Sequence, residues 1–235
     1  MRKILLLVTL AFISIIAIGC GATETTPPQG NEQETHPYQL ESLIYEVEGV
    51  KIQYPQLTKT QNKELEERIN KQIADDVLLY ANQYKSTEDM LEMNYQIMMQ
   101  TSEIISILFL GEYNAGMYPT HLLFTTTVDL QEGEKIKLPV RVEINEEFID
   151  RFLKSKYIDR ESPESPNEEK QAAVIEYVKG IPRNDLIDAF KTADIPDMDQ
   201  NVYGIYSYYT EDGMVISIQV PHALGDHAEF QFTDK

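Results

Sequence analysis

The sequence has one cysteine, no tryptophan and few basic residues: 20 lysines and arginines stand against 39 aspartates and glutamates in 235 residues, a formal charge of −19. One cysteine cannot pair within the chain, which excludes a disulfide-stapled scaffold. The acidity all but excludes a general nucleic-acid-binding protein, because such a surface repels the phosphate backbone. With 42% hydrophobic residues, the chain still falls in the range of globular proteins.

The start of the chain is typical of an export signal. Arg2 and Lys3 precede an apolar run over residues 4–18, which is shorter than the roughly 20 residues that span a bilayer. A basic start, a short apolar run and small residues at its end predict a signal peptide over residues 1–19. The small residues before Cys20 resemble a bacterial lipobox, so we expect Cys20 to be acylated, for example with palmitate. A signal anchor with an incidental or buried cysteine is the alternative.

These features predict an extracytoplasmic protein that is lipid-anchored to the outer face of the plasma membrane, with a monoderm host preferred. Several acyl chains on one residue would make the anchoring stable. The segment after Cys20 is rich in Thr, Gln, Glu and Pro, which predicts a flexible tether over residues 20–38 and a folded domain over 39–235. Removing residues 1–19 takes away two positive charges, so the mature charge is −19 − 2 = −21. Such a surface favours basic partners, although acidity that serves solubility alone is the simpler alternative.

Apolar patterning predicts a single α+β domain with an antiparallel sheet and packed helices. Alternation predicts strands over 43–54 with a turn at 48–49, and over 93–99, 104–110, 122–130, 203–209, 214–220 and 228–232. Three-to-four spacing predicts helices over 62–84, 146–154 and 168–179, and a short helix capped by Asn184. Pro55 is expected to end the second strand, and residues 111–119 are expected to form a loop. Strands and helices come in runs rather than in strict alternation, which indicates the α+β class.

Catalytic motifs are missing from the sequence. It contains no Gly-x-Ser-x-Gly elbow, phosphate loop or dinucleotide fingerprint, and its one cysteine is assigned to the anchor. His222, Asp226 and His227 lie together near the C-terminus and could bind zinc, but their spacing fits no standard motif and no third strong ligand is near. We therefore expect no enzyme activity, metal or cofactor. A carboxylate pair that acts on glycosidic bonds stays open as an alternative.

Tyrosines are the more suggestive side chains. Several crowd one predicted strand, Tyr206 and Tyr208 among them, and Tyr113 and Tyr118 flank the loop predicted over residues 111–119. Tyrosine offers a large amphipathic contact surface at low entropic cost. The candidate partner-binding residues are therefore Tyr113, Tyr118, Tyr206, Tyr208, His222, Asp226 and His227. The simpler alternative is that tyrosines at alternate positions are ordinary sheet residues.

Short motifs along the folded part resemble one family of bacterial extracytoplasmic domains. They are Ser106-Ile-Leu-Phe-Leu-Gly111-Glu-Tyr-Asn-Ala-Gly116-Met-Tyr-Pro119, then Gly133-Glu-Lys-Ile-Lys-Leu138, and Asp212-Gly-Met-Val-Ile-Ser-Ile-Gln-Val-Pro221-His-Ala-Leu-Gly225-Asp-His. The family forms the outer half of lysozyme-sensing anti-sigma factors of Firmicutes, and a related accessory module precedes the catalytic domain of some peptidoglycan deacetylases. The resemblance spans residues 46–232.

The resemblance implies a binding domain rather than an active site. The anti-sigma members recognise lysozyme, a small and very basic enzyme, which suits the acidity of this chain. With only a lipid anchor expected, the chain would not hold a sigma factor, and deacetylase activity does not transfer to it. We therefore expect a surface lipoprotein that binds an envelope partner, either a lysozyme-like protein or cell-wall glycan (peptidoglycan). The alternatives are a cell-wall-acting hydrolase or deacetylase-associated enzyme, and a structural lipoprotein of envelope assembly.

Overall fold

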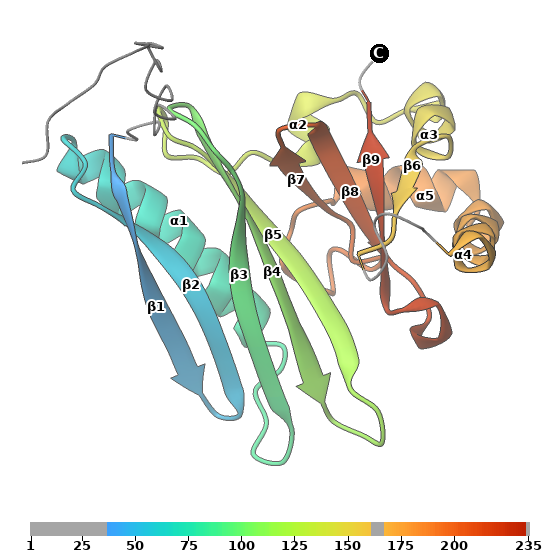
Figure 1. The fold of residues 1–235 in the computed structure, drawn as a ribbon, viewed down its shortest axis with the longest axis horizontal. Coiled ribbons are helices and arrows are strands. Elements are labelled where there is room, and N and C mark those ends of the chain that lie inside the picture. The colour runs from blue at the N-terminus through green and yellow to red at the C-terminus, as the bar shows by residue number, and fades with distance from the viewer. Residues whose placement is uncertain (1–36, 161–166, 234–235) are drawn as a thin grey trace, which may run out of the picture. The chain divides into compact units, whose positions relative to one another are not determined.

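The computed structural model describes residues 37–160 and 167–233, in which two sheets and their helices form an α+β fold, as predicted. The signal peptide, Cys20 and the tether lie outside the described residues. Sheet A has the strand order β1-β2-β3-β4-β5, and sheet B has the order β6-β9-β8-β7. Figure 1 shows the two sheets side by side, with α1 behind sheet A.

Sheet A is antiparallel except at one pair. Its strands are β1 (Gln39–Val47), β2 (Val50–Thr58), β3 (Met90–Gln100), β4 (Ile104–Asn114) and β5 (Thr120–Asp129). Strands β2 and β3 pair in parallel over three residues, because the helix α1 (Lys63–Ala81) carries the chain back between them. The turn predicted at Glu48-Gly49 is confirmed, and both residues have positive φ, as a tight hairpin turn requires.

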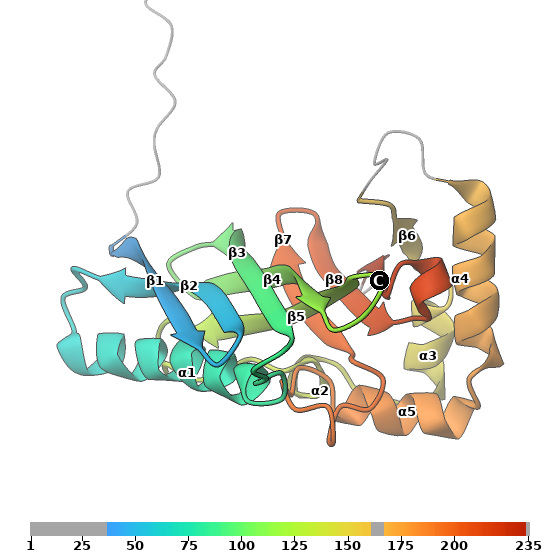
Figure 2. The same cartoon turned by 90° about the horizontal axis from the view of Figure 1, so that it is seen from below.

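Helix α1 covers one face of sheet A, as Figure 2 shows from below. It begins where the sequence predicts, because the side chain of Asn62 accepts a hydrogen bond from the backbone N–H of Leu65 at 3.1 Å. The ring of Tyr80 stacks on Phe124, and Phe124 stacks on Phe109, each with centroids 4.2 Å apart. This aromatic column joins the helix to the two strands that lie nearest sheet B.

Sheet B lies between sheet A and the remaining helices. Its strands are β6 (Lys156–Ile158), β7 (Tyr206–Thr210), β8 (Gly213–Gln219) and β9 (His227–Phe232). One side packs against α2 (Leu138–Arg141), α3 (Glu146–Phe152), α4 (Glu168–Gly180) and α5 (Arg183–Lys191), around Phe148 and Phe190. The other side packs on sheet A, so strands β4 and β5 are buried on both faces.

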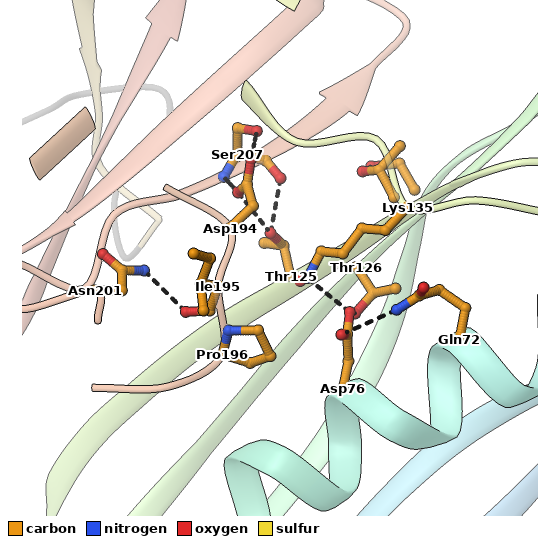
Figure 3. Close-up of polar contacts among 12 residues, drawn as sticks. Gln72, Asp76, Thr125, Thr126, Lys135, Asp194, Ile195, Pro196, Asn201 and Ser207 are labelled. Atoms are coloured by element: carbon orange, nitrogen blue, oxygen red, sulfur yellow. Dashed lines mark hydrogen bonds and ion pairs between the residues drawn. The ribbon is translucent and has the colours of Figure 1, made fainter. Parts of the chain in front are cut away.

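Buried polar contacts fix the two sheets together, as Figure 3 shows. Neighbouring residues of β5 point to opposite faces: Thr126 donates to Asp76 of α1 at 2.7 Å, and Thr125 donates to the Ser207 carbonyl of β7 at 2.7 Å. Asp194 accepts from the Ser207 hydroxyl at 2.7 Å. Burial raises the pKa of Asp194, against the lowering effects of Lys135 and of these hydrogen bonds. These contacts hold β5 between α1 and β7.

Several predicted boundaries need correction. Strand β2 continues through Pro55, which pairs with Ser42 of the edge strand β1 at a position where its missing N–H costs little. Strand β4 extends to Asn114, so the hairpin that follows it is shorter than the predicted loop. Helix α5 is preceded by Pro182 rather than capped by Asn184. The three-residue strand β6 was missed, because so short a segment shows no alternation.

Candidate functional site

A cleft of about 420 Å³ opens between the two sheets. Strands β4 and β5 form one wall, and the other is formed by β6, β9, α4 and the short 3-10 helix η1 (His222–Leu224). We call it the inter-sheet cleft. Its basic lining residues are His121, Arg160, Lys170, His222 and His227, and its acidic ones are Glu112, Asp159 and Glu229. The volume is in the range of small-molecule binding sites.

A buried carboxylate holds two histidine rings at the mouth of this cleft. Asp226 accepts hydrogen bonds from the backbone N–H of His121 at 2.8 Å, from Nδ1 of His121 at 3.1 Å and from Nδ1 of His222 at 3.0 Å. Burial raises the pKa of Asp226, but these hydrogen bonds outweigh it, so the pKa lies below its usual value. Asp226 has a left-handed backbone with φ of 69° and follows Gly225 with φ of 103°. The shape of this turn directs the carboxylate toward β5.

From the sequence, His222, Asp226 and His227 were expected to lie together. In the structure, His222 and Asp226 do lie together, but the third residue of the group is His121 and not His227. No sequence signal links His121 to them, because it lies 105 residues away from Asp226 and meets it through the packing of the sheets. His227 instead places Nε2 3.7 Å from Glu229. Burial lowers the pKa of His227, which keeps its ring neutral near pH 7.

Tyr206 and Tyr208 are not surface residues, so their assignment to a partner-binding surface is corrected. They are 3% and 1% exposed, because sheet B turns this face of β7 onto sheet A. Tyr208 donates its hydroxyl hydrogen to Glu229 and accepts from Arg160 Nη2 at 2.6 Å, while Arg160 also binds Glu229 with two nitrogens. This triad supports the floor of the inter-sheet cleft. Burial raises the pKa of both tyrosines.

Tyr113 and Tyr118 lie where a partner could reach them. Tyr113 is half-buried, with its ring edge against Tyr84 and its hydroxyl 3.1 Å from Asp89. Tyr118 is 68% exposed at the β4–β5 hairpin, and its ring centroid lies 6.3 Å from that of His222. The hairpin therefore borders the mouth of the inter-sheet cleft.

Several exposed apolar side chains occur toward the end of sheet A to which this hairpin belongs. In Figure 1, the β1–β2 turn, the α1–β3 loop and the β4–β5 hairpin all lie at this lower end. Its exposed apolar residues are Ile44, Val47, Met90, Met117 and Tyr118. Carboxylates outnumber lysines around them: Glu46, Glu48, Glu88, Asp89, Glu92 and Glu112 stand against Lys51 and Lys85. We call this surface the acidic end. Val47, the last residue of β1, lies at the acidic end, about 26 Å from Gln39 at the start of the strand, at a rise of about 3.3 Å per residue.

Within residues 37–160 and 167–233, no group of three His, Cys, Asp or Glu side chains is arranged to hold a metal ion. In the same part of the chain, no helix has both the length and the apolar character needed to cross a membrane.

The comparisons with known proteins give structural neighbours only. No family model and no curated protein matches the chain. A DUF3298 family member from Bacteroides fragilis NCTC 9343 is 12% identical, with 84% of this chain and 91% of that chain covered and a TM-score of 0.48. A DUF3298 family protein from Pseudomonas aeruginosa PAO1 is 10% identical, with 85% and 91% covered and a TM-score of 0.47. The link to lysozyme-sensing and deacetylase-associated domains stays a prediction.

Proposed function

We propose that this chain is a surface lipoprotein, anchored through acylated Cys20, whose folded domain binds an envelope partner without catalysis. The N-terminal sequence supports the anchor, because the only cysteine lies where the apolar run ends. The charge of −19 supports a basic partner, because complementary charge speeds encounter and disfavours other partners. A lysozyme-like protein fits this description, and cell-wall glycan is the other partner class.

The observation that carries the binding function is the acidic end. Met117 and Tyr118 are 88% and 68% exposed on the β4–β5 hairpin, at the end of sheet A where carboxylates outnumber lysines. Soluble proteins rarely leave large apolar groups together on the surface without a use. Methionine and tyrosine are enriched where proteins meet, and a charged rim is typical of such sites. A basic protein would cover the apolar centre and pair with the carboxylates.

The test uses residues 36–235, because His36–Lys235 forms one compact unit. Binding to lysozyme and to purified peptidoglycan is measured for the wild type and for the Met117→Ser/Tyr118→Ser variant. We expect the variant to lose roughly tenfold or more in affinity for lysozyme, as for a central interface residue. The matched control is Val140→Ser on α2, an exposed apolar residue away from the acidic end.

Two results would contradict the proposal. One is the absence of binding to either ligand at micromolar concentrations. The other is an equal loss of affinity in the Val140→Ser control, which would show that the acidic end has no special role.

A second candidate is an enzyme that acts on the cell wall, and the pairing of one carboxylate with two imidazoles favours it. A carboxylate that accepts a hydrogen bond from Nδ1 fixes the ring tautomer and leaves Nε2 to act as a base, as at His222. The Nε2 of His121 lies 3.8 Å from Glu112 instead. This candidate predicts turnover of peptidoglycan fragments that is lost in His222→Ala, with the thermal unfolding of the domain unchanged. Absence of turnover by the wild type would remove it.

A further inference from the structure

A shallow groove lies beside helix α4, apart from the inter-sheet cleft. Two open hollows of about 300 and 650 Å³ form it, and both are lined by Tyr177 of α4 and Tyr203 of the loop before β7. The other lining residues belong to α4, to the connection between α4 and α5, to the loop before β7 and to the segment from the end of β8 to η1. We call this surface the tyrosine groove. Two hollows that meet at a pair of side chains suit an elongated ligand better than a compact one.

The lining of the tyrosine groove carries almost no charge. Six residues line the smaller hollow and eight line the larger one, and with the two tyrosines in common the groove has twelve lining residues in the described part of the chain. Glu176, which is exposed on α4, is the one charged residue among these twelve, whereas 25% of the whole chain is charged. An anionic ligand would find no cation in this lining, and a cationic ligand would find a single solvated carboxylate. The lining therefore favours an uncharged ligand.

The loop that carries Tyr203 is held in place by a buried asparagine. Asn201 is 1% exposed, and its side chain accepts a hydrogen bond from the Ile205 N–H at 2.8 Å and donates one to the Ile205 carbonyl at 2.9 Å. The carbonyl of Tyr203 accepts from the N–H of Gln219 at 3.0 Å, which ties the loop to β8. Because these bonds fix the backbone around Tyr203, little ordering of the loop is needed when a ligand binds.

Tyr177 is supported by the packing of α4. Val174 and Val178 of the same helix are buried in the core between sheet B and the helices. The side chains of Tyr177 and Tyr203 pack against this core and stay partly exposed. Each tyrosine therefore presents part of its surface to solvent from a packed base.

A sugar chain has the kind of surface that such a groove contacts. The C–H groups on one face of a pyranose ring pack on an aromatic ring, and its hydroxyl groups exchange hydrogen bonds with polar side chains. Tyr177 and Tyr203 offer rings and hydroxyls, and Gln219 adds an exposed amide at the end of β8. A proline-rich peptide also packs on aromatic side chains. The expected location beside cell-wall glycan favours the sugar, and the peptide is one arm of the test.

We propose that the tyrosine groove binds an uncharged oligosaccharide, with successive sugar rings against Tyr177 and Tyr203. The proposal gives the glycan partner of the proposed function a site of its own and rests on that function. The tyrosine groove shares no lining residue with the acidic end or with the inter-sheet cleft, so sugar binding and lysozyme binding can fail independently.

The experiment titrates residues 36–235 with three probes: the β-1,4-linked tetramer of N-acetylglucosamine, the N-acetylglucosamine monomer and a decaproline peptide. We expect the tetramer to bind roughly tenfold or more tightly than the monomer, because only the tetramer can contact both tyrosines at once. The affinity for the tetramer should not change between about 0.05 and 0.5 M sodium chloride, because the ligand has no charge to screen.

Substitutions of single tyrosines place the site. Tyr177→Leu and Tyr203→Leu keep apolar bulk but remove the aromatic ring, and each should weaken tetramer binding roughly tenfold. Tyr203→Phe keeps the ring and should retain most of the affinity. The matched control is Tyr45→Leu on β1, a partly exposed tyrosine outside the groove, which should bind the tetramer as the wild type does. Thermal unfolding of each variant shows that the domain is folded.

Four results would overturn the proposal. They are no tetramer binding at millimolar concentrations, an affinity that rises only in proportion to the number of sugar units, an equal loss in Tyr45→Leu, and decaproline binding tighter than that of the tetramer. Lysozyme binding that persists in any of these cases would leave the proposed function standing.

Discussion

Replacement of Lys135 by methionine tests whether the buried polar contacts between α1, β5 and the segment that follows β5 stabilise the fold. Lys135 Nζ lies 2.6 Å from Asp76 Oδ2, and the two side chains are only 5% and 7% exposed. Thr126 and Gln72 complete the hydrogen bonds of Asp76, at 2.7 and 3.2 Å (Figure 3). Methionine keeps much of the apolar length of lysine but removes the charge, so Lys135→Met leaves the Asp76 carboxylate buried without its cation.

The expected loss in the free energy of unfolding is about 3–5 kcal/mol, the usual cost of breaking a buried ion pair by removing one partner. The matched control is Lys71→Met. Lys71 pairs with Asp75 on the same helix, but the two side chains are 74% and 52% exposed, so the loss should stay below about 1 kcal/mol. The double variant Lys135→Met/Asp76→Leu should recover most of the loss, because no unpaired charge remains.

Urea unfolding of residues 36–235 near neutral pH, followed by far-ultraviolet circular dichroism, measures all four proteins. If Lys135→Met and Lys71→Met lost the same free energy of unfolding, the reasoning would be refuted, because the Lys135–Asp76 pair would then behave as a solvent-exposed pair. Loss in the double variant as large as in the single one would also refute it, because the unpaired carboxylate would then not be the cause.

Two further predictions concern local contacts. The pKa of Asp226 is lowered in the folded state, so the Asp226 carboxylate stabilises the fold above pH 3.8, the usual pKa of the group, and this stabilisation is lost as the pH falls further. In unfolding curves taken from pH 6 downward, Asp226→Asn should therefore lose less stability toward acid pH than the wild type. Asn62→Ala removes the cap of α1 and should cost about 1 kcal/mol, with an unchanged stability in urea contradicting the assigned cap.

The sequence predicted those turns and helix starts that depend on residues close together in the chain. The turn at Glu48-Gly49 follows from a change in the phase of alternation, and α1 and α4 begin after Asn62 and Asn167, whose side chains accept from the first turn. These features depend on residues a few positions apart. The strands β4 and β5 were also recognisable from the alternation of their apolar residues, and β4 is in addition apolar at positions of both parities, as in a strand that is covered on both faces.

Features that depend on the packing of the two sheets could not be predicted in this way. Tyr206 and Tyr208 alternate as surface tyrosines do, but sheet B turns them onto sheet A, where they are buried. The contact of His121 with Asp226 joins a strand and a turn that are 105 residues apart in the sequence, so no spacing rule reveals it. The inter-sheet cleft exists only because of the same packing, and only its residues near the C-terminus were candidates beforehand.

Mass spectrometry of the protein purified from its native membrane tests the central claim most directly. The account predicts a chain that begins at Cys20 and carries acyl groups on that residue, and a Cys20→Ser variant that is neither processed nor acylated. An unmodified chain that begins at Met1 and is recovered from the soluble cell interior would contradict it.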